Sequence, residues 1–123
     1  MKLHLSSIKD RNTFTGHGPG YVAVNNTNHH NPLVVMADRL IADWPVAGLA
    51  MLTPEAIRQL LEYQPEIIIL GTGAVQQFPV PAALQPLFEA RIGLEVMDTP
   101  AACRTYNILM AEERRVLAAM WPP

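Results

Sequence analysis

The spacing of apolar positions changes near the middle of the chain, and the change predicts two kinds of structure. In the first half, short apolar runs at 21–24, 33–36 and 40–44 are separated by turn residues. Runs of this length with short connections are typical of antiparallel strands. Before them, the stretch 16–20 holds three glycines in five positions, and we interpret it as a loop.

The second half begins with a predicted helix after Thr53. The Thr53 side chain can accept a hydrogen bond from a free helical N–H group, and Pro54 suits the first helical position. Apolar side chains then share one helical face: Ile57, Leu60 and Leu61. Pro65 ends the helix, because the residue before a proline is disfavoured in the α region.

Strand and helix patterns then alternate to the end of the chain. We predict strands at 66–70, 94–97 and 116–120 and helices at 82–91 and 99–112. Gly71 ends the first of these strands, Pro86 starts or kinks the first helix, and Gly93 closes it. This order predicts a single α/β domain over residues 1–123, with three layers, a mainly parallel central sheet covered by helices, and an N-terminal set of antiparallel strands.

Composition narrows the functional classes. Of the 123 residues, 50% are hydrophobic and 16% charged, which is enough to bury one core. The net charge of −2 gives no electrostatic footprint for nucleic acid. Apolar runs are far shorter than the roughly 20 residues of a membrane helix. The start of the chain, with Lys2, Lys9 and Asp10, does not resemble a secretory signal, and one cysteine forms no internal disulfide, so we expect a cytoplasmic protein.

Two loops are candidates for binding a small anion. Gly71, Thr72 and Gly73 follow a buried strand, and Asp98 precedes a helix that Thr99 can cap. Free N–H groups at a helix start attract phosphate or carboxylate, with Arg104 nearby as a partner. A plain turn and a normally capped helix explain the same residues and are the favoured interpretation. The glycines lack the third glycine of a dinucleotide fingerprint, so we predict no cofactor.

Cys103 is the one candidate nucleophile, because it lies one turn into the predicted helix, where a thiol pKa can fall. On a helical wheel, however, Cys103 borders Ala102, Tyr106 and Met110, which are the side chains expected in the core. No histidine lies in this half of the chain; a Cys–His pair would need His4, His17, His29 or His30. We favour a structural cysteine and predict no catalytic residue.

Two further pairs of residues have a structural and a functional interpretation. His29 and His30 point in opposite directions if the segment is extended, and no other ligand lies at a chelating spacing, so we predict no metal site. Trp44 and Trp121, each followed by a proline, either cover the edge of the core or anchor a partner protein at the surface. The first interpretation is favoured for both tryptophans.

Four segments together carry a family resemblance. These are the glycine-rich turn 18–20, the pair Trp44-Pro45, the segment 65–73 and the run 95–107. With them the chain resembles the small-domain family that includes mitochondrial NADH dehydrogenase (complex I) assembly factor 3 and bacterial and archaeal homologues. The resemblance implies a three-layer α/β domain without established enzyme activity, whose mitochondrial members bind protein partners during respiratory complex assembly. We therefore expect a bacterial, non-enzymatic protein-interaction or assembly-factor-like domain; the alternatives are an anion-binding module and an enzyme that uses Cys103.

Overall fold

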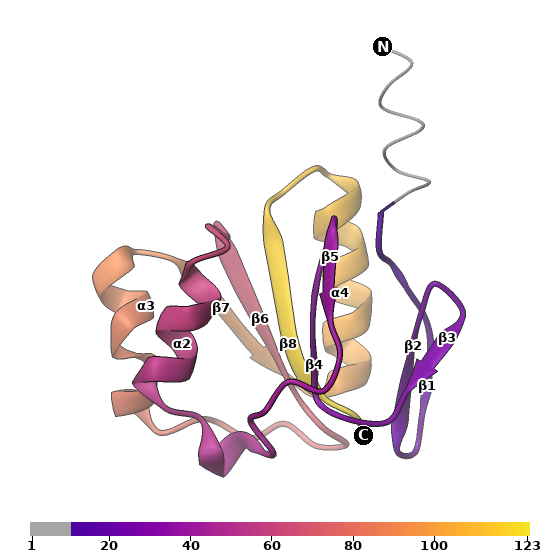
Figure 1. The fold of residues 1–123 in the computed structure, drawn as a ribbon, viewed down its shortest axis with the longest axis horizontal. Helices are drawn as coiled ribbons and strands as arrows, with labels where there is room; N and C mark the ends of the chain where they lie inside the picture. Colours follow the sequence, from indigo (N-terminus) through magenta and orange to yellow (C-terminus); the bar gives the residue numbers. More distant parts are fainter. Residues whose placement is uncertain (1–10) are drawn as a thin grey trace.

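The computed structural model describes residues 11–123, which form an α/β fold of two sheets and three α-helices (Figure 1). Residues 1–10, on which the expectation of a cytoplasmic location rests, lie outside this range. The strands are β1 (Phe14–Gly18), β2 (Tyr21–Val24), β3 (Thr27–His29), β4 (Leu33–Met36), β5 (Arg39–Ile41), β6 (Ile67–Thr72), β7 (Gly93–Met97) and β8 (Val116–Trp121). The helices are α2 (Pro54–Leu61), α3 (Gln85–Ala90) and α4 (Thr99–Ala111), with short 3-10 helices η1 (Leu49–Met51) and η2 (Pro81–Leu84).

The central sheet is mixed, which corrects the prediction of a mainly parallel sheet. Its strand order is β5-β4-β8-β6-β7. β6 pairs in parallel with β7 and β8, whereas β4 pairs antiparallel with both β5 and β8. β4 lies inside this sheet because all four of its residues are buried, and such a strand needs cover on both faces. The predicted strand at 40–44 is the shorter edge strand β5.

The N-terminal strands form a separate antiparallel sheet of order β1-β2-β3. The prediction of a loop at 16–20 was wrong for 16–18, because β1 extends to Gly18 and pairs with β2, whereas residues 19–20 form the turn between these strands. Gly18 lies close to the Tyr21 ring: a Cβ atom added to it would be 2.6 Å from that ring, so the Tyr21 side chain would have to move. β3 also forms within a stretch that we assigned to turns, with Asn28 opposite Ala23.

The helix predictions in the second half hold closely. Thr53 caps α2 through its hydroxyl oxygen, which accepts from the Ala56 N–H at 3.1 Å, and Pro54 is the first helical residue. The predicted helix at 82–91 is divided into η2 and α3, with the change just before Pro86. Its end is at Arg91, whose φ is 58°, and Gly93 instead begins β7.

Core side chains on the two faces of the central sheet alternate along each strand. One cluster joins Ile68, Leu70 and Leu117 to residues of α2 and α3; the other joins Ile69, Ala118 and residues of α4. In Figure 1, α2 and α3 accordingly lie on one side of the sheet and α4 on the other. No helix among residues 11–123 has the length and apolar character needed to cross a membrane.

Candidate functional site

The two candidate loops lie in direct contact. β6 ends beside the start of α4, and the Gly73 N–H donates to the Thr99 hydroxyl oxygen at 2.8 Å. In return, the Thr99 N–H donates to the Gly73 carbonyl at 2.9 Å. The Thr99 hydroxyl donates its own proton to the Trp121 carbonyl at 2.6 Å, and Thr99 is fully buried. The candidate residues Gly73 and Thr99 therefore form hydrogen bonds with each other.

Gly71 and Thr72 continue this internal junction. A Cβ atom on Gly71 would lie 2.8 Å from the Met120 Cβ and 3.1 Å from the Ala102 Cβ, so glycine allows α4 to pack closely on β6 and β8. The Thr72 hydroxyl donates to the Val75 carbonyl at 2.8 Å and accepts from the Gln77 N–H at 3.1 Å. Thr72 thereby fixes the loop that follows β6.

The first turn of α4 has its N–H groups engaged within the chain. Asp98, and not Thr99 as predicted, is the N-cap residue, and its carboxylate accepts from the Ala101 N–H at 2.8 Å. Pro100 has no N–H, and the Ala102 N–H donates to the Asp98 carbonyl at 2.9 Å. Thr99 cannot cap because its hydroxyl serves Gly73 and Trp121. The outward-pointing donors that motivated an anion site are therefore occupied, and ligand binding at these residues stays a prediction.

Cys103 lies in the core, as its helical wheel indicated. It is 3% exposed and packs with Ala102, Tyr106 and Met110 on the face of α4 turned to the sheet. Burial raises the pKa of the Cys103 thiol from 9.0 to about 12, and the positive charge of Arg104 offsets part of that rise. Arg104 itself is exposed on the outer side of the helix. A protonated, covered thiol is a poor nucleophile.

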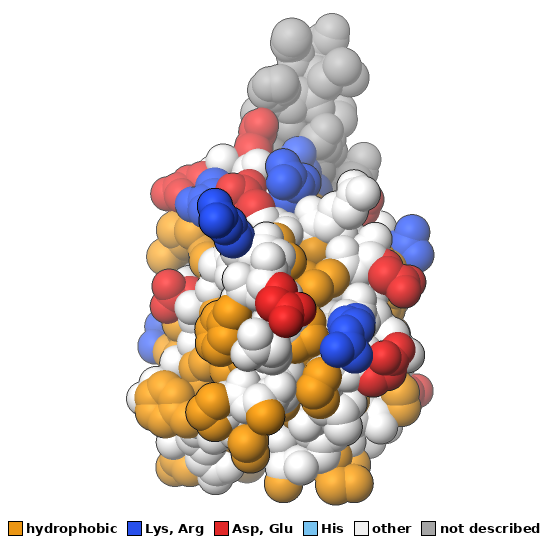
Figure 2. All heavy atoms as spheres, turned by 90° about the vertical axis from the view of Figure 1, so that its left-hand side faces the viewer, with side chains coloured by type: hydrophobic (Ala, Val, Ile, Leu, Met, Phe, Trp, Pro, Cys, Tyr) orange, Lys and Arg blue, Asp and Glu red, His pale blue; other side chains and the backbone are white. Residues whose placement is uncertain are grey.

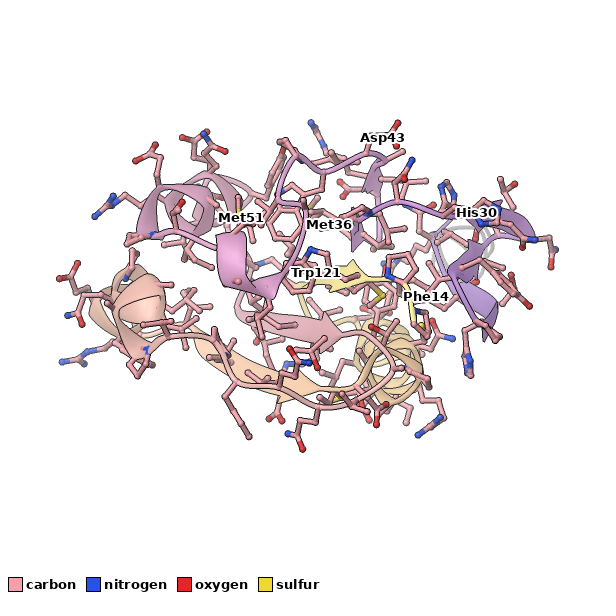
Figure 3. All side chains as sticks on the ribbon, turned by 90° about the horizontal axis from the view of Figure 1, so that it is seen from below. Phe14, His30, Met36, Asp43, Met51 and Trp121 are labelled. Atoms are coloured by element: carbon pink, nitrogen blue, oxygen red, sulfur yellow. The ribbon has the colours of Figure 1, made fainter. Side chains whose placement is uncertain are left out.

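The two tryptophans belong to the core. Trp44 and Trp121 are 6% and 7% exposed, their ring centroids lie 5.5 Å apart, and the Trp121 indole N–H donates to the Val46 carbonyl at 2.8 Å. Figure 3 shows Trp121 in the interior of the molecule. The alternative that these residues anchor a partner at the surface is thus excluded by their burial.

The adjacent histidines His29 and His30 lie at the end of β3, in the N-terminal sheet. The Nδ1 of His30 lies 3.3 Å from the Gly20 carbonyl oxygen, while the Nε2 of His29 is buried without a hydrogen-bond partner among residues 11–123. Within the same range, no group of three or more His, Cys, Asp or Glu side chains is placed to hold a metal ion. That no metal binds here stays a prediction.

The sequence analysis did not predict that several large apolar side chains close together in the chain would be exposed. We call this group the apolar segment 75–88, because Val75, Phe78, Val80 and Phe88 are exposed by 60%, 73%, 67% and 55%. They lie on the loop after β6, at the start of η2 and on α3. Figure 2 shows hydrophobic side chains gathered over much of the face that α2 and α3 form. The available signal was the sequence VQQFPVP, which has apolar residues and prolines without helical or strand spacing.

Hydrogen bonds to the end of β6 and to β7 hold the loop that carries Val75 and Phe78. Thr72 binds the Val75 carbonyl and the Gln77 N–H, as described above. The Gln76 side chain donates to the Val96 carbonyl of β7 at 2.8 Å. β7 is an edge strand of the central sheet, so Gln76 covers one of its backbone acceptors. The apolar side chains are presented to solvent by a fixed loop.

The fold and the exposed apolar segment define a small α/β domain without an evident catalytic centre in residues 11–123. The profile of a family described as "Protein of unknown function (DUF498/DUF598)" matches residues 14–121. The chain belongs to this family. A Bordetella parapertussis protein of known crystal structure is 39% identical in sequence to this chain and superposes on it with a TM-score of 0.85. The match covers 92% of this chain and 97% of the Bordetella chain.

The names of two relatives indicate different roles. NADH dehydrogenase [ubiquinone] 1 alpha subcomplex assembly factor 3 of Danio rerio is 34% identical over 102 residues, which cover 81% of this chain and 58% of the relative. The chain spans about half the length of the assembly-factor relatives. The "13 kDa major membrane protein" of Francisella tularensis is 26% identical over 94% of this chain and 95% of its own. The resemblance to the assembly factor 3 family is thereby confirmed.

Proposed function

We propose that this chain is a non-enzymatic protein-interaction domain of the assembly-factor type. The single observation that carries the proposal is the apolar segment 75–88, whose four large side chains are each more than half exposed. Large contiguous apolar patches on a protein surface mark interaction sites, and hydrophobic side chains gather over the face that α2 and α3 form (Figure 2). Aromatic anchors such as Phe78 contribute disproportionately to the binding energy when a partner buries them.

The names of relatives support the same class of function. The Danio rerio relative is named as an assembly factor of an NADH dehydrogenase subcomplex, and this name supports a role of this chain in contacting other proteins. The partner of this chain would present an apolar surface that covers Phe78 and Val80. Because Thr72 and Gln76 fix the loop, the segment loses little conformational freedom on binding, which favours affinity.

Neither alternative function gains support from the geometry. The N–H groups of the α4 start are bound to Gly73 and Asp98, so an anion would have to displace existing hydrogen bonds. An enzyme that uses Cys103 would have to expose and deprotonate a buried thiol whose pKa is raised. We keep the protein-interaction proposal as the conclusion.

We also infer that the interaction takes place in the cytoplasm, as the sequence led us to expect. Fractionation of cells that express a tagged full-length chain tests this point. Recovery with soluble cytoplasmic markers is the expected result, whereas recovery with membrane markers after a salt wash would contradict the cytoplasmic location and leave the interaction proposal standing.

The interaction proposal is tested by comparing captured partners of three chains. The wild type, a Phe78→Ser/Val80→Ser variant and an Ile108→Ser control are used as bait in extracts of the source organism. Ile108 is a suitable control because it is 59% exposed but lies on α4, away from the segment. We expect one partner to be captured by the wild type and the control and lost with the double variant. Equal capture by all three chains would contradict the proposal.

A further inference from the structure

A surface hollow of about 320 Å³ lies at the end of the central sheet opposite to the loop that carries Val75 and Phe78. Four parts of the chain form it: Arg11 before β1, the end of β4 with the turn to β5, the residues before β6, and the turn from α4 to β8. β6 and β8 begin here, at Ile67 and Val116, and run in parallel to the end that carries Gly73. The hollow is therefore separate from the proposed partner surface and the Gly73–Thr99 junction.

Arginines are concentrated around this hollow. Residues 11–123 contain seven arginines and no lysine, and three of the arginines line the hollow: Arg11, Arg114 and Arg115. A fourth, Arg39, lies with its guanidinium carbon 5.3 Å from the ring centroid of Tyr63, which also lines the hollow. Asp38 and Glu113 line the same hollow, so carboxylates partly balance the positive charge of the arginines.

The arginines differ in how many of their guanidinium N–H groups already form hydrogen bonds or ion pairs within the chain. The Arg114 Nε lies 3.1 Å from a carboxylate oxygen of Glu66, so its charge is largely balanced. Arg115 uses its Nε to donate to the Gln64 carbonyl at 3.2 Å, which leaves its two terminal nitrogens without a partner among residues 11–123. Arg11 makes one long contact of 3.5 Å to the Met110 carbonyl. Arg11 and Arg115 thus have donors available for an anion.

Other lining residues add apolar surface and hydrogen-bond acceptors. Met36 and Val116 are nearly buried and form part of the wall, together with the ring of Tyr63. The carboxylates of Asp38 and Glu113 also line the hollow, and neither forms an ion pair within the described residues. The hollow has the size of small-ligand sites, which typically hold about 300–1,000 Å³ and combine apolar walls with a few polar groups.

We infer that this hollow binds a small organic anion with an apolar body and an N–H or O–H donor. Arg11 and Arg115 would bind the carboxylate or phosphate, because guanidinium groups match the geometry of both. Tyr63 and Met36 would contact the apolar body, and Asp38 or Glu113 would accept from the donor. The site does not depend on the proposed partner surface.

Nuclear magnetic resonance titration of the full-length chain tests the inference. The probes are 4-hydroxyphenylacetate, phenyl phosphate, inorganic phosphate and the uncharged 4-hydroxybenzyl alcohol. We expect saturable shifts of the Ala37 and Val116 amide signals with at least one of the two ring-bearing anions. The anion that binds more tightly shows whether the hollow prefers a carboxylate or a phosphate. Inorganic phosphate, which lacks the apolar body, and the uncharged alcohol should bind at least tenfold more weakly.

Two variants assign the binding to the arginines. Arg115→Met keeps the length of the side chain and removes its charge, and Arg11→Met does the same on the facing segment. We expect each to weaken binding of the ring-bearing anion by about tenfold, because each removes charge-assisted hydrogen bonds to the anion. The control Arg104→Met, on the exposed side of α4, should leave binding unchanged. Absence of saturable shifts with every anion, or equal affinity in both variants and wild type, would overturn the inference.

Discussion

Gly73 and Thr99 are 26 residues apart in the chain and hold each other through two hydrogen bonds. Gly73 donates to the Thr99 hydroxyl and accepts from the Thr99 N–H, and the same hydroxyl donates to the Trp121 carbonyl. One buried side chain thereby connects the ends of β6 and β8 with the start of α4. The junction engages backbone groups of both candidate loops in hydrogen bonds within the chain.

Replacement of Thr99 by valine should destabilise the fold strongly. Valine keeps the shape of threonine but leaves the Gly73 N–H and the Trp121 carbonyl without their partner. An unsatisfied buried polar group costs about 1–3 kcal/mol, so we expect a loss of about 2–4 kcal/mol in the free energy of unfolding. Urea unfolding followed by tryptophan fluorescence measures it. Thr105→Val, at a half-buried position of α4, is the control and should cost less than about 1 kcal/mol; similar losses in the two variants would contradict this role of Thr99.

Replacement of Gly71 by alanine should destabilise the fold, because it disturbs the packing of α4 on the sheet. The added methyl group would lie 2.8 Å from the Met120 Cβ and 3.0 Å from the Thr99 hydroxyl oxygen, and both neighbours are buried. Overpacking of this kind typically costs about 1–3 kcal/mol. The matched control is Gly48→Ala, because Gly48 has extended backbone and a methyl group added there would have nothing within 4 Å. Thermal unfolding should show a clear decrease in Tm for Gly71→Ala and little change for the control, and an unchanged Tm in both would refute the packing argument.

Stability should fall as the pH rises above 9, with Cys103 as one cause. The thiol pKa is raised from 9.0 to about 12 in the folded chain, so between these values the unfolded state loses a proton that the folded state keeps. The free energy of unfolding must therefore decrease as pH rises through this range. Burial also raises the pKa of Tyr106, which adds to the decrease at the upper end.

The contribution of Cys103 can be separated with a Cys103→Ala variant. Urea unfolding under reducing conditions at pH 8, 9 and 10 should give a smaller decrease for the variant than for the wild type. In parallel, alkylation of the native thiol at pH 7 should be much slower than that of a small free thiol and should become fast in urea. A native rate equal to that of the small thiol would show an accessible thiolate and would revive the catalytic alternative.

The parts of the fold that the sequence predicted well are those fixed by neighbouring residues. Thr53 and Pro54 define the start of α2 by local hydrogen bonding and a fixed φ angle, and the structure agrees. The isoleucine run of β6 required cover on both faces, and β6 is the strand between β8 and β7. Cys103 was placed correctly because the faces of a helix follow from spacing alone.

The features that the sequence did not predict depend on contacts between distant segments. β1 forms because Phe14 pairs with β2 and exchanges two backbone hydrogen bonds with the Asn107 side chain, 93 residues away. Thr99 looks like a helix cap locally, but Gly73 and Trp121 take its hydroxyl. β4 joins the central sheet through its pairing with β8, at the far end of the chain. The spacing of apolar and polar residues does not show which distant segments pair in this way.

The central claim, that a partner protein binds the apolar segment 75–88, is tested most directly by site-specific photo-cross-linking in living cells. Two variants are compared: a photoreactive phenylalanine analogue replaces Phe78 in the first and Ile108 in the second. Both positions are exposed, and they lie on different elements. We predict a discrete cross-linked protein from position 78 that is absent from position 108. The same cross-linked protein from both positions, or none from position 78, would contradict the claim.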